Sequence, residues 1–254
     1  MKFAGIIAEY DPFHNGHAWQ LAQAKALGAE RVAVAMSCSL VQRGALPLLP
    51  EAVRTRSALT CGADLVFALP APCACAGAEA FARAGVALLA AAGCDGLVFG
   101  AETPDAALLM EAAELLDSGS YRAALKAQLA GGARSFAAAR QAAAAKLASD
   151  ERVAALLDKP NNNLAVEYCR AIRSLAPRME AYPLPRQGAN HGEALHSAHG
   201  QFASASALRK LWAEGGADAV APYVPEAVFP LYQEAYAAGQ YTDFSAAGRC
   251  ELAL

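Results

Sequence analysis

The sequence has few features that would direct it to nucleic acid, a membrane or an oxidising compartment. Its net charge is −3 and its pI is near 6.0, so it offers no general attraction for a polyanion. The longest uncharged apolar stretch, residues 65–78, is too short to span a bilayer and contains two prolines. No secretion signal is expected at the start, because Glu9 and Asp11 interrupt the first apolar run. We therefore expect a cytoplasmic protein without membrane contact.

The seven cysteines also lack the spacing of a disulfide or metal framework. Their number is odd and no C-x-x-C occurs, so neither a disulfide scaffold nor a zinc ribbon is favoured. We interpret most of them as small buried residues in a reducing compartment. Cys73 and Cys75, one residue apart, leave a metal site open as an alternative, but we assign no metal ligand.

The 254 residues do contain an alternation of short apolar runs and helical segments. Helical periodicity between successive runs predicts a parallel sheet with right-handed crossovers. We therefore predict an α/β fold, a Rossmann-like parallel sheet of about five strands. The runs typical of buried strands are residues 3–7, 31–36, 64–69, 95–99 and 179–184.

A change of pattern after the fourth run divides the chain. Residues 104–159 show helical periodicity and no strand signal, so we interpret them as a helical insertion. Residues 1–103 and 160–254 then form one Rossmann-like domain. Asparagines at 161–163 are expected to cap a helix over residues 164–175. The helices of the insertion are expected at residues 105–117, 119–130 and 133–157.

The most informative segment is FAGIIAEYDPFHNGH, residues 3–17. Its pattern predicts a strand, a loop and the first turn of a helix, in this order. Such a turn is a natural phosphate site, since free N–H groups and the helix dipole point at the anion. Gly16 has no Cβ and lets a ligand approach the backbone. His14 and His17 can donate to charge that grows on a transferring phosphate. Two histidines three apart are also typical of half a zinc site, which is the alternative.

A second polar group opens the helix expected from residue 204. Ser204 and Ser206 can cap this helix and bond a phosphate oxygen. Arg209 carries a planar guanidinium suited to phosphate one turn further on. A capped helix with a surface arginine is the alternative. Together with the histidine turn, we favour two elements that close on the β- and γ-phosphates.

The loop over residues 186–202 begins at Arg186 and holds the three remaining histidines, His191, His196 and His199. It is long, irregular and polar, which is typical of a lid over a binding site. We interpret it as a mobile lid over the nucleotide, with a metal site in the loop as the alternative.

Seven sequence blocks cover nearly the whole chain: GIIAEYDPFHNGH, MSCSLVQRG, GADLV, GAEAFARAG, GCDGLVFGAE, NNNLAVEY and SASALRK, in this order. Together they resemble the tRNA(Met) cytidine acetate ligase family of the H-x-G-H nucleotidyltransferase superfamily. The resemblance implies a Rossmann-like fold that binds ATP and acetate and forms acetyl-adenylate, and we expect Mg²⁺ to accompany the ATP. The acetyl group would then pass to N4 of the wobble cytidine of elongator tRNA(Met).

The motifs of this family, with the pattern above, give the predicted site. His14, His17 and Arg209 are assigned to catalysis. The residues assigned to nucleotide binding are Gly16, Ser37, Arg43, Glu102, Asn162, Arg186, Ser204 and Ser206.

The chain departs from the family pattern at several positions. Asp11 stands where the family usually has asparagine, and Glu51 where it has lysine. The loop over residues 45–51 differs, and family members usually continue with a further helical region. Two alternatives therefore stay open. One is a nucleotidyltransferase that acts on another small acid or phosphate ester without tRNA, and the other is an ATP-binding protein that has lost turnover.

Overall fold

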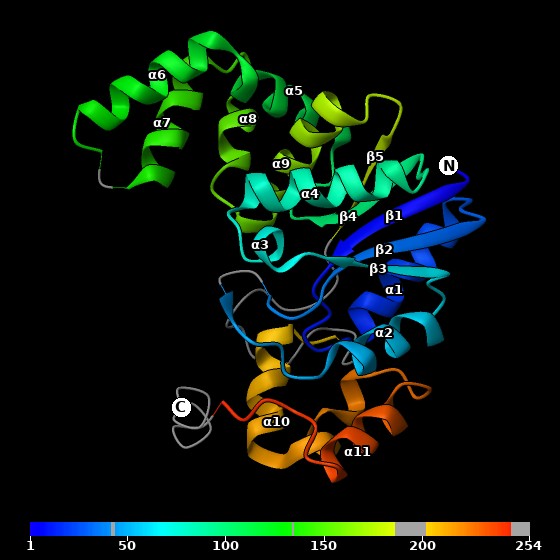
Figure 1. Cartoon of the computed structure of the whole chain (residues 1–254). Coiled ribbons are helices and arrows are strands. Elements are labelled where there is room, and N and C mark those ends of the chain that lie inside the picture. Colours follow the sequence, from blue (N-terminus) through cyan, green and yellow to red (C-terminus); the bar gives the residue numbers. More distant parts are fainter. Residues whose placement is uncertain (42–43, 134, 186–201, 245–254) are drawn as a thin grey trace. The chain divides into compact units, whose positions relative to one another are not determined.

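The computed structural model describes residues 1–41, 44–133, 135–185 and 202–244. Packing divides the chain into two compact units, shown in the ribbon of Figure 1. The first unit comprises Met1–Gly77 and Gln187–Leu254, and the second unit comprises Ala78–Arg186. Each unit contains parallel strands with helices against them, so each is described by itself.

The first unit contains three parallel strands, with β2 between β1 and β3. Phe3 pairs with Arg31 at the start of the first ladder, and Ala33 pairs with Leu65 in the second. Apolar residues fill β2 on both faces, which is typical of a parallel strand covered by helices. The strands are β1 Phe3–Ala8, β2 Arg31–Ser37 and β3 Leu65–Leu69.

The helices of the first unit follow these strands or come from the last part of the chain. Helix α1 packs on β2, α2 packs on β3, and α11 packs on both α2 and α10. The buried face of α2 includes Val53, Ser57 and Ala58, together with one charged residue, Arg54. The helices are α1 Asn15–Ala26, α2 Glu51–Thr60, α3 Ala71–Ala74, α10 Ala205–Val220, the 3₁₀ helix η2 Ala221–Tyr223 and α11 Phe229–Ala237.

The second unit is a helical assembly around two parallel strands, β4 Gly96–Ala101 and β5 Glu180–Pro185. Its central helix is α9, which packs against α4, α5 and both strands. Val166, Cys169 and Ile172 lie on the buried side of α9 at helical spacing. The helices are α4 Ala78–Ala91, α5 Ala106–Asp117, α6 Gly119–Ala130, α7 Phe136–Leu147, α8 Glu151–Leu156 and α9 Pro160–Leu175.

The five parallel strands confirm the predicted α/β fold class, and two details of the helices are corrected. The helix expected at residues 133–157 is two helices, because α7 ends at Leu147 and Asp150 caps α8 by accepting the Arg152 amide at 2.8 Å. Helix α9 begins at Pro160, so the asparagines form its first turn and do not precede it. Helices α5 to α8 lie within the second unit. Among the described residues, no helix is long and apolar enough to cross a membrane.

Candidate functional site

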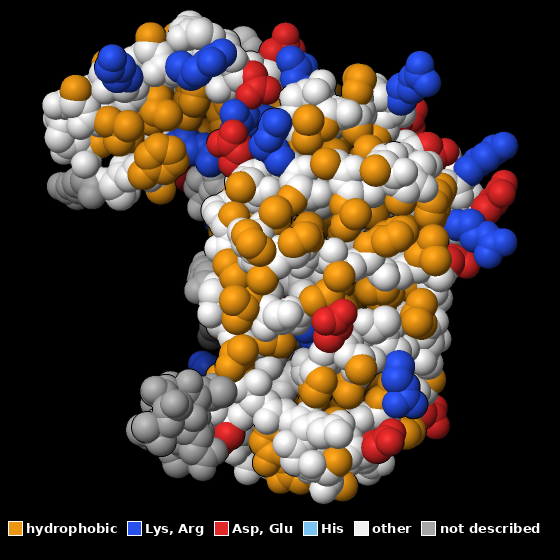
Figure 2. Space-filling view, in the orientation of Figure 1, with side chains coloured by type: hydrophobic (Ala, Val, Ile, Leu, Met, Phe, Trp, Pro, Cys, Tyr) orange, Lys and Arg blue, Asp and Glu red, His pale blue; other side chains and the backbone are white. Residues whose placement is uncertain are grey.

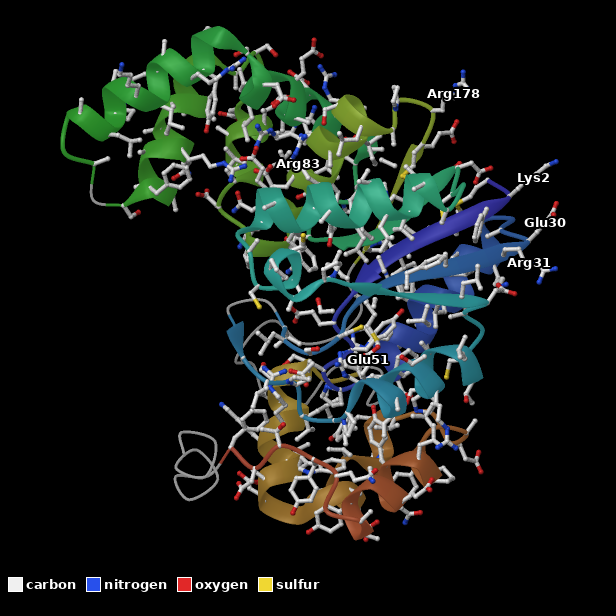
Figure 3. The ribbon with its side chains drawn as sticks, viewed as in Figure 1. Lys2, Glu30, Arg31, Glu51, Arg83 and Arg178 are labelled. Carbon is white, nitrogen blue, oxygen red and sulfur yellow. The ribbon has the colours of Figure 1, made fainter. Side chains whose placement is uncertain are left out.

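The site of the first unit starts where β1 ends. Figure 3 shows Lys2, Glu30 and Arg31 at the amino ends of β1 and β2, and Glu51 toward the opposite ends. After β1 the chain turns sharply, because Tyr10 has a φ of 50°, a value that few residues other than glycine adopt. This turn brings residues 14–17 to the start of α1.

His14 and His17 close the amino end of α1 by accepting backbone hydrogen bonds. Nδ1 of His14 accepts from the Gly16 amide at 3.0 Å, and Nδ1 of His17 accepts from the His14 amide at 3.2 Å. The two rings are stacked, with centroids 3.7 Å apart and planes at 23°. Because each Nδ1 is an acceptor, hydrogen bonding assigns the proton of each neutral ring to Nε2. Each imidazole therefore has an Nε2–H group as its donor.

The backbone amides at the start of α1 are less available than the sequence suggested. The Gly16 amide donates to the His14 ring, and the amides of His17 and Ala18 donate to the His14 carbonyl at 2.9 and 3.1 Å. The expectation of free N–H groups is therefore wrong for these three amides. The helix dipole still favours an anion here, and donation to an anion by the imidazoles stays a prediction.

Gly16 is needed for the conformation of the turn itself. A Cβ at this position would lie 2.9 Å from Cε1 and 3.0 Å from Nδ1 of His14, closer than side chains normally approach. It would also lie 3.8 Å from the Phe202 ring. The absence of a side chain therefore keeps the His14 ring in its capping position. The contact with Phe202 brings the segment before α10 beside the turn.

The aromatic side chains around the turn hold the second imidazole in place. The His17 ring packs edge-on against Tyr10, with centroids 4.8 Å apart, and at a tilt against Phe13, at 5.6 Å. Both aromatic residues are buried, and the Phe13 carbonyl accepts a hydrogen bond from Tyr232 at 2.7 Å. The imidazole therefore rests on a fixed apolar surface, which reduces the freedom that a catalytic donor would lose on binding.

The predicted serine and arginine group lies at the start of α10, in the same unit. Ser204 caps the helix by accepting the Ala207 amide at 3.2 Å, and its hydroxyl lies 3.0 Å from that of Ser206. Nη1 of Arg209 donates to the Asp11 carbonyl at 2.6 Å and to Oδ2 of Asp11 at 3.1 Å. Since Asp11 precedes the histidine turn by three residues, the structure joins two groups that are distant in the sequence.

A fully buried arginine, Arg54, ties together the chain at the ends of β1 and β2. Its guanidinium donates to the carbonyls of Glu9 at 2.7 Å, Ser37 at 2.6 Å and Leu49 at 3.0 Å, and also to the Cys38 carbonyl. Burial lowers the pKa of Arg54. The Ser37 side chain is fully buried, and its hydroxyl has no hydrogen-bond partner within the described residues. Nucleotide binding by Ser37 stays a prediction.

Glu51, which replaces the lysine of the family pattern, is exposed in the first turn of α2. A carboxylate there is favourable for the helix dipole. It also lies near Cys38, where burial first and the Glu51 carboxylate second raise the thiol pKa to about 11. The Cys38 thiol is therefore protonated and unreactive at neutral pH.

Glu102 and Asn162 lie in the second unit, at the amino end of α9. The Glu102 carboxylate accepts from the Asn161 amide at 3.3 Å, the Asn161 side chain at 2.6 Å and the Asn162 amide at 2.7 Å. The Asn162 side chain accepts from the Thr103 amide at 2.9 Å and donates to the Thr103 hydroxyl at 3.1 Å. Asn162 is 1% exposed. Both residues hold the loop after β4, and their role in nucleotide binding stays a prediction.

Several residues of the predicted site and of the predicted lid lie outside the described ranges: Arg43, Arg186, His191, His196 and His199.

The described side chains do not form a metal site. Within residues 1–41, 44–133, 135–185 and 202–244, no group of three or more His, Cys, Asp or Glu side chains could hold a metal ion. Cys73 and Cys75 are thiols without a disulfide partner. The two imidazoles therefore have no third ligand in this part of the chain, and their donors suit an anion better than a cation.

Two residues help to build the site, but the sequence did not reveal their structural roles. Asp11 stood out only as a departure from the family's asparagine, and nothing local revealed its pairing with Arg209, 198 positions away. No local sequence pattern indicates that Arg54 is buried, because its burial depends on tertiary packing. The resulting site offers two imidazole donors, a guanidinium and the positive end of α1, which together can stabilise a polyphosphate.

Comparisons with known proteins identify the family of this chain. A family model described as HIGH Nucleotidyl Transferase matches residues 1–251. The tRNA(Met) cytidine acetate ligase of Syntrophotalea carbinolica is 41% identical over 218 residues, which cover 85% of this chain and 52% of that protein. The tRNA(Met) cytidine acetate ligase of Caldanaerobacter subterraneus is 35% identical over 244 residues, covering 94% of this chain and 60% of that protein.

Two solved structures resemble this chain along most of its length. The crystal structure of Thermotoga maritima TmcAL bound with alpha-thio ATP matches with a TM-score of 0.85 and 30% identity. The matched region covers 95% of this chain and 57% of the TmcAL chain. The apo form of the same protein matches with a TM-score of 0.88. This chain therefore spans between 52% and 60% of the length of these relatives.

Proposed function

Because the chain belongs to the HIGH Nucleotidyl Transferase family, we propose that it binds ATP at the histidine turn and activates acetate as acetyl-adenylate. The observation that supports this most is the pair of imidazoles whose Nδ1 atoms accept backbone hydrogen bonds. In that tautomer Nε2 of each ring carries the proton and can donate to a phosphate oxygen. The TmcAL relative with alpha-thio ATP supports the choice of nucleotide.

The proposed reaction is an in-line displacement at the α-phosphorus of ATP. A carboxylate oxygen of acetate forms a bond to this phosphorus, the bond to the β-phosphate oxygen breaks, and pyrophosphate leaves with the electron pair. Acetate is already ionised at neutral pH, so the reaction needs no general base. The chain's contribution is to position the reactants and to stabilise charge, through His14, His17 and Arg209.

The Mg²⁺ ion in this proposal would arrive with ATP. Mg²⁺ is usually held by substrate phosphates and one or two carboxylates, and it keeps several waters. The described residues provide no cage of three or more ligating side chains. We therefore assign no protein ligand to Mg²⁺.

The test is acetate-dependent exchange of labelled pyrophosphate into ATP. Replacing one transition-state donor, His17→Ala, should lower the exchange rate by about 10²–10³. Arg56→Ala is the matched control, because this arginine is exposed and its nearest acidic partner is 3.8 Å away. If the wild-type protein shows no pyrophosphate exchange with any small carboxylate tested, the proposal is excluded.

A second step transfers the activated acetyl group to an acceptor. We infer that acetyl passes from the adenylate to N4 of the wobble cytidine of elongator tRNA(Met), as the names of the relatives suggest, and that the protein works in the cytoplasm. Figure 2 shows acidic and basic side chains interspersed over the helices of the second unit on the face drawn. Transfer of labelled acetyl to elongator tRNA(Met), with initiator tRNA as control, tests this step.

A second candidate function is adenylylation of another small acid or phosphate ester without tRNA. Two observations favour it: the chain has a pI near 6.0, and Glu51 places an acid where the family pattern has lysine. A screen of small acids that follows pyrophosphate release separates the two candidates. Acetate as the best substrate, followed by transfer to tRNA, would reject this second candidate.

A further inference from the structure

Asp11 is a buried acid that holds two different parts of the first unit. Its side chain is 4% exposed. Oδ1 accepts the Leu48 amide at 2.6 Å, and Oδ2 accepts from Nη1 of Arg209 at 3.1 Å. The backbone carbonyl of Asp11 accepts from the same Nη1 at 2.6 Å. Each carboxylate oxygen therefore has its own donor, one from the loop before α2 and one from α10.

These contacts use one side of the Arg209 guanidinium and leave another. Nη1 makes both bonds to Asp11. In the part of the chain that the structure describes, Nε and Nη2 of Arg209 donate to no protein atom, and the side chain is 34% exposed. Nε and Nη2 lie on one edge of the planar group, which is the geometry that binds two oxygens of a phosphate at once.

We propose that Asp11 is a positioning residue that orients Arg209, so that its Nε–Nη2 edge binds the polyphosphate of ATP. This proposal rests on the proposed nucleotide site at the histidine turn. Asp11 itself does not contact the nucleotide. It acts by holding Nη1, and it thereby removes one rotational freedom that Arg209 would otherwise lose when ATP binds.

Asp11 could affect ATP binding in two ways, by orienting Arg209 or by repelling the phosphates through its own charge, and the two effects have opposite signs. A carboxylate near a polyphosphate repels it, so loss of the Asp11 charge alone would tighten ATP binding. Loss of the orientation of Arg209 would instead weaken ATP binding. The sign of the change therefore decides between the two.

Asp11→Asn is the sharpest variant because it keeps the shape of the side chain. An amide has one acceptor oxygen and an NH₂ group, so it cannot accept from both donors with separate oxygens. The Leu48 amide is fixed in the main chain and is expected to keep the oxygen. The NH₂ group then faces Nη1 of Arg209, and the orienting contact through the side chain is lost.

The experiment measures ATP affinity by calorimetry on the whole chain, with no acetate present. We expect Asp11→Asn to raise the Kd for ATP roughly fivefold to tenfold, within the range for coupled neighbours. In an Arg209→Lys background, where the Nε–Nη2 edge is absent, the same change should alter the Kd by less than about twofold. Thermal melts of each variant report folding independently.

Two outcomes would overturn the proposal. One is tighter ATP binding by Asp11→Asn, and the other is an equal loss of affinity with and without the Arg209 edge. Failure of the proposed function gives a different result, because a wild-type protein that binds ATP without acetate-dependent exchange leaves the affinity cycle measurable. A wild-type protein that does not bind ATP would reject both proposals.

Discussion

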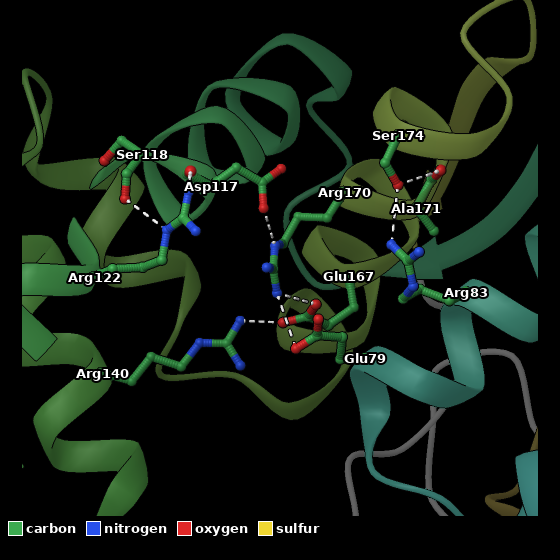
Figure 4. A network of polar contacts seen from close by, with 10 residues as sticks. All are labelled: Glu79, Arg83, Asp117, Ser118, Arg122, Arg140, Glu167, Arg170, Ala171 and Ser174. Carbon is green, nitrogen blue, oxygen red and sulfur yellow. Dashed lines mark hydrogen bonds and ion pairs between the residues drawn. The ribbon is translucent and has the colours of Figure 1, made fainter. Parts of the chain in front are cut away.

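Each of the two units contains an arginine with several polar partners, but the two arginines differ in the partners that they bind. In the first unit, Arg54 donates to four main-chain carbonyls. In the second unit, Arg170 binds carboxylates, with Asp117 at 2.8 Å, Glu167 at 2.7 Å and Glu79 at 3.5 Å, as Figure 4 shows. A carbonyl of the main chain cannot be removed by substitution, whereas a carboxylate can. The first arrangement therefore fixes the path of the chain, and the second fixes side chains between helices.

The carboxylate network extends to a further helix. Glu167, on α9, is 2% exposed and also accepts from Arg140 of α7. Although burial lowers the pKa of Arg170, its bonds to Asp117 and Glu167 outweigh this and raise the pKa. The acidic and the basic groups of the network therefore each have partners of opposite charge, which is the condition under which buried charge is tolerated. Helices α5, α7 and α9 are joined by it.

The largest effect is expected from Arg54→Met. This change leaves four carbonyls, three of them in buried hydrogen bonds, without their donor, and we expect it to lower the free energy of unfolding by about 4 kcal/mol. Arg54→Lys should recover only part of the loss, since an ammonium lacks the planar array of five donors. Urea denaturation measures both. A loss below about 1 kcal/mol for Arg54→Met would show that the carbonyls find other donors, and the contrast between the units would disappear.

The next largest effect is expected from Glu167→Gln in the second unit. Removing this buried charge leaves Arg140 and Arg170, which are 16% and 22% exposed, without their shared partner, so we expect a loss of about 2 kcal/mol in the free energy of unfolding. Glu79→Gln is the matched control, because Glu79 is 63% exposed and lies 3.5 Å from Arg170. The control should cost no more than about 0.5 kcal/mol. Urea denaturation at low and high salt measures both variants.

Replacing three charged residues of the network together tests whether its ionic partners can be exchanged for apolar ones. Changing Arg140, Glu167 and Arg170 together to Met, Leu and Met should recover most of the loss, because apolar residues of similar volume can replace a buried ionic group. No equivalent replacement exists for Arg54, whose partners are carbonyls. A triple variant less stable than Glu167→Gln would contradict the distinction between replaceable and irreplaceable partners.

The sequence predicted the strands and the histidine turn because both depend on local pattern. Apolar runs, the turn H-x-G-H and the start of the helix at Ser204 carry their own signal over a few residues, and the resemblance to a known family added Glu102 and Asn162. The pairing of Asp11 with Arg209 and the burial of Arg54 depend on contacts across 198 and up to 45 positions. Such contacts follow from tertiary packing, which no local period encodes. The split of the helix at Leu147 was missed because alanine-rich sequence continues across it.

A smaller effect is expected for Asp11, the buried acid of the first unit. Burial raises the pKa of Asp11 above its ordinary value of 3.8, while the Leu48 amide and the nearby arginines lower it in part. The folded state therefore binds more protons than the unfolded state in the interval above 3.8, so this group's contribution to stability falls as pH rises there. The unfolding free energy of wild type, relative to Asp11→Asn, should decline with rising pH. A rising difference would mean that attraction by Arg209 outweighs burial.

The smallest effect is expected from Arg56→Ala, which is the matched control for Arg54. Both arginines lie on α2, two positions apart, but the Arg56 side chain is 60% exposed and its nearest carboxylate, that of Glu234, is 3.8 Å away. Exposed pairs of this kind gain little, because water screens the attraction and ordering two long side chains costs entropy. Urea denaturation should place Arg56→Ala within about 0.5 kcal/mol of wild type. A loss comparable to that of Arg54→Met would mean that arginine on this helix stabilises through its position and not through its carbonyl partners.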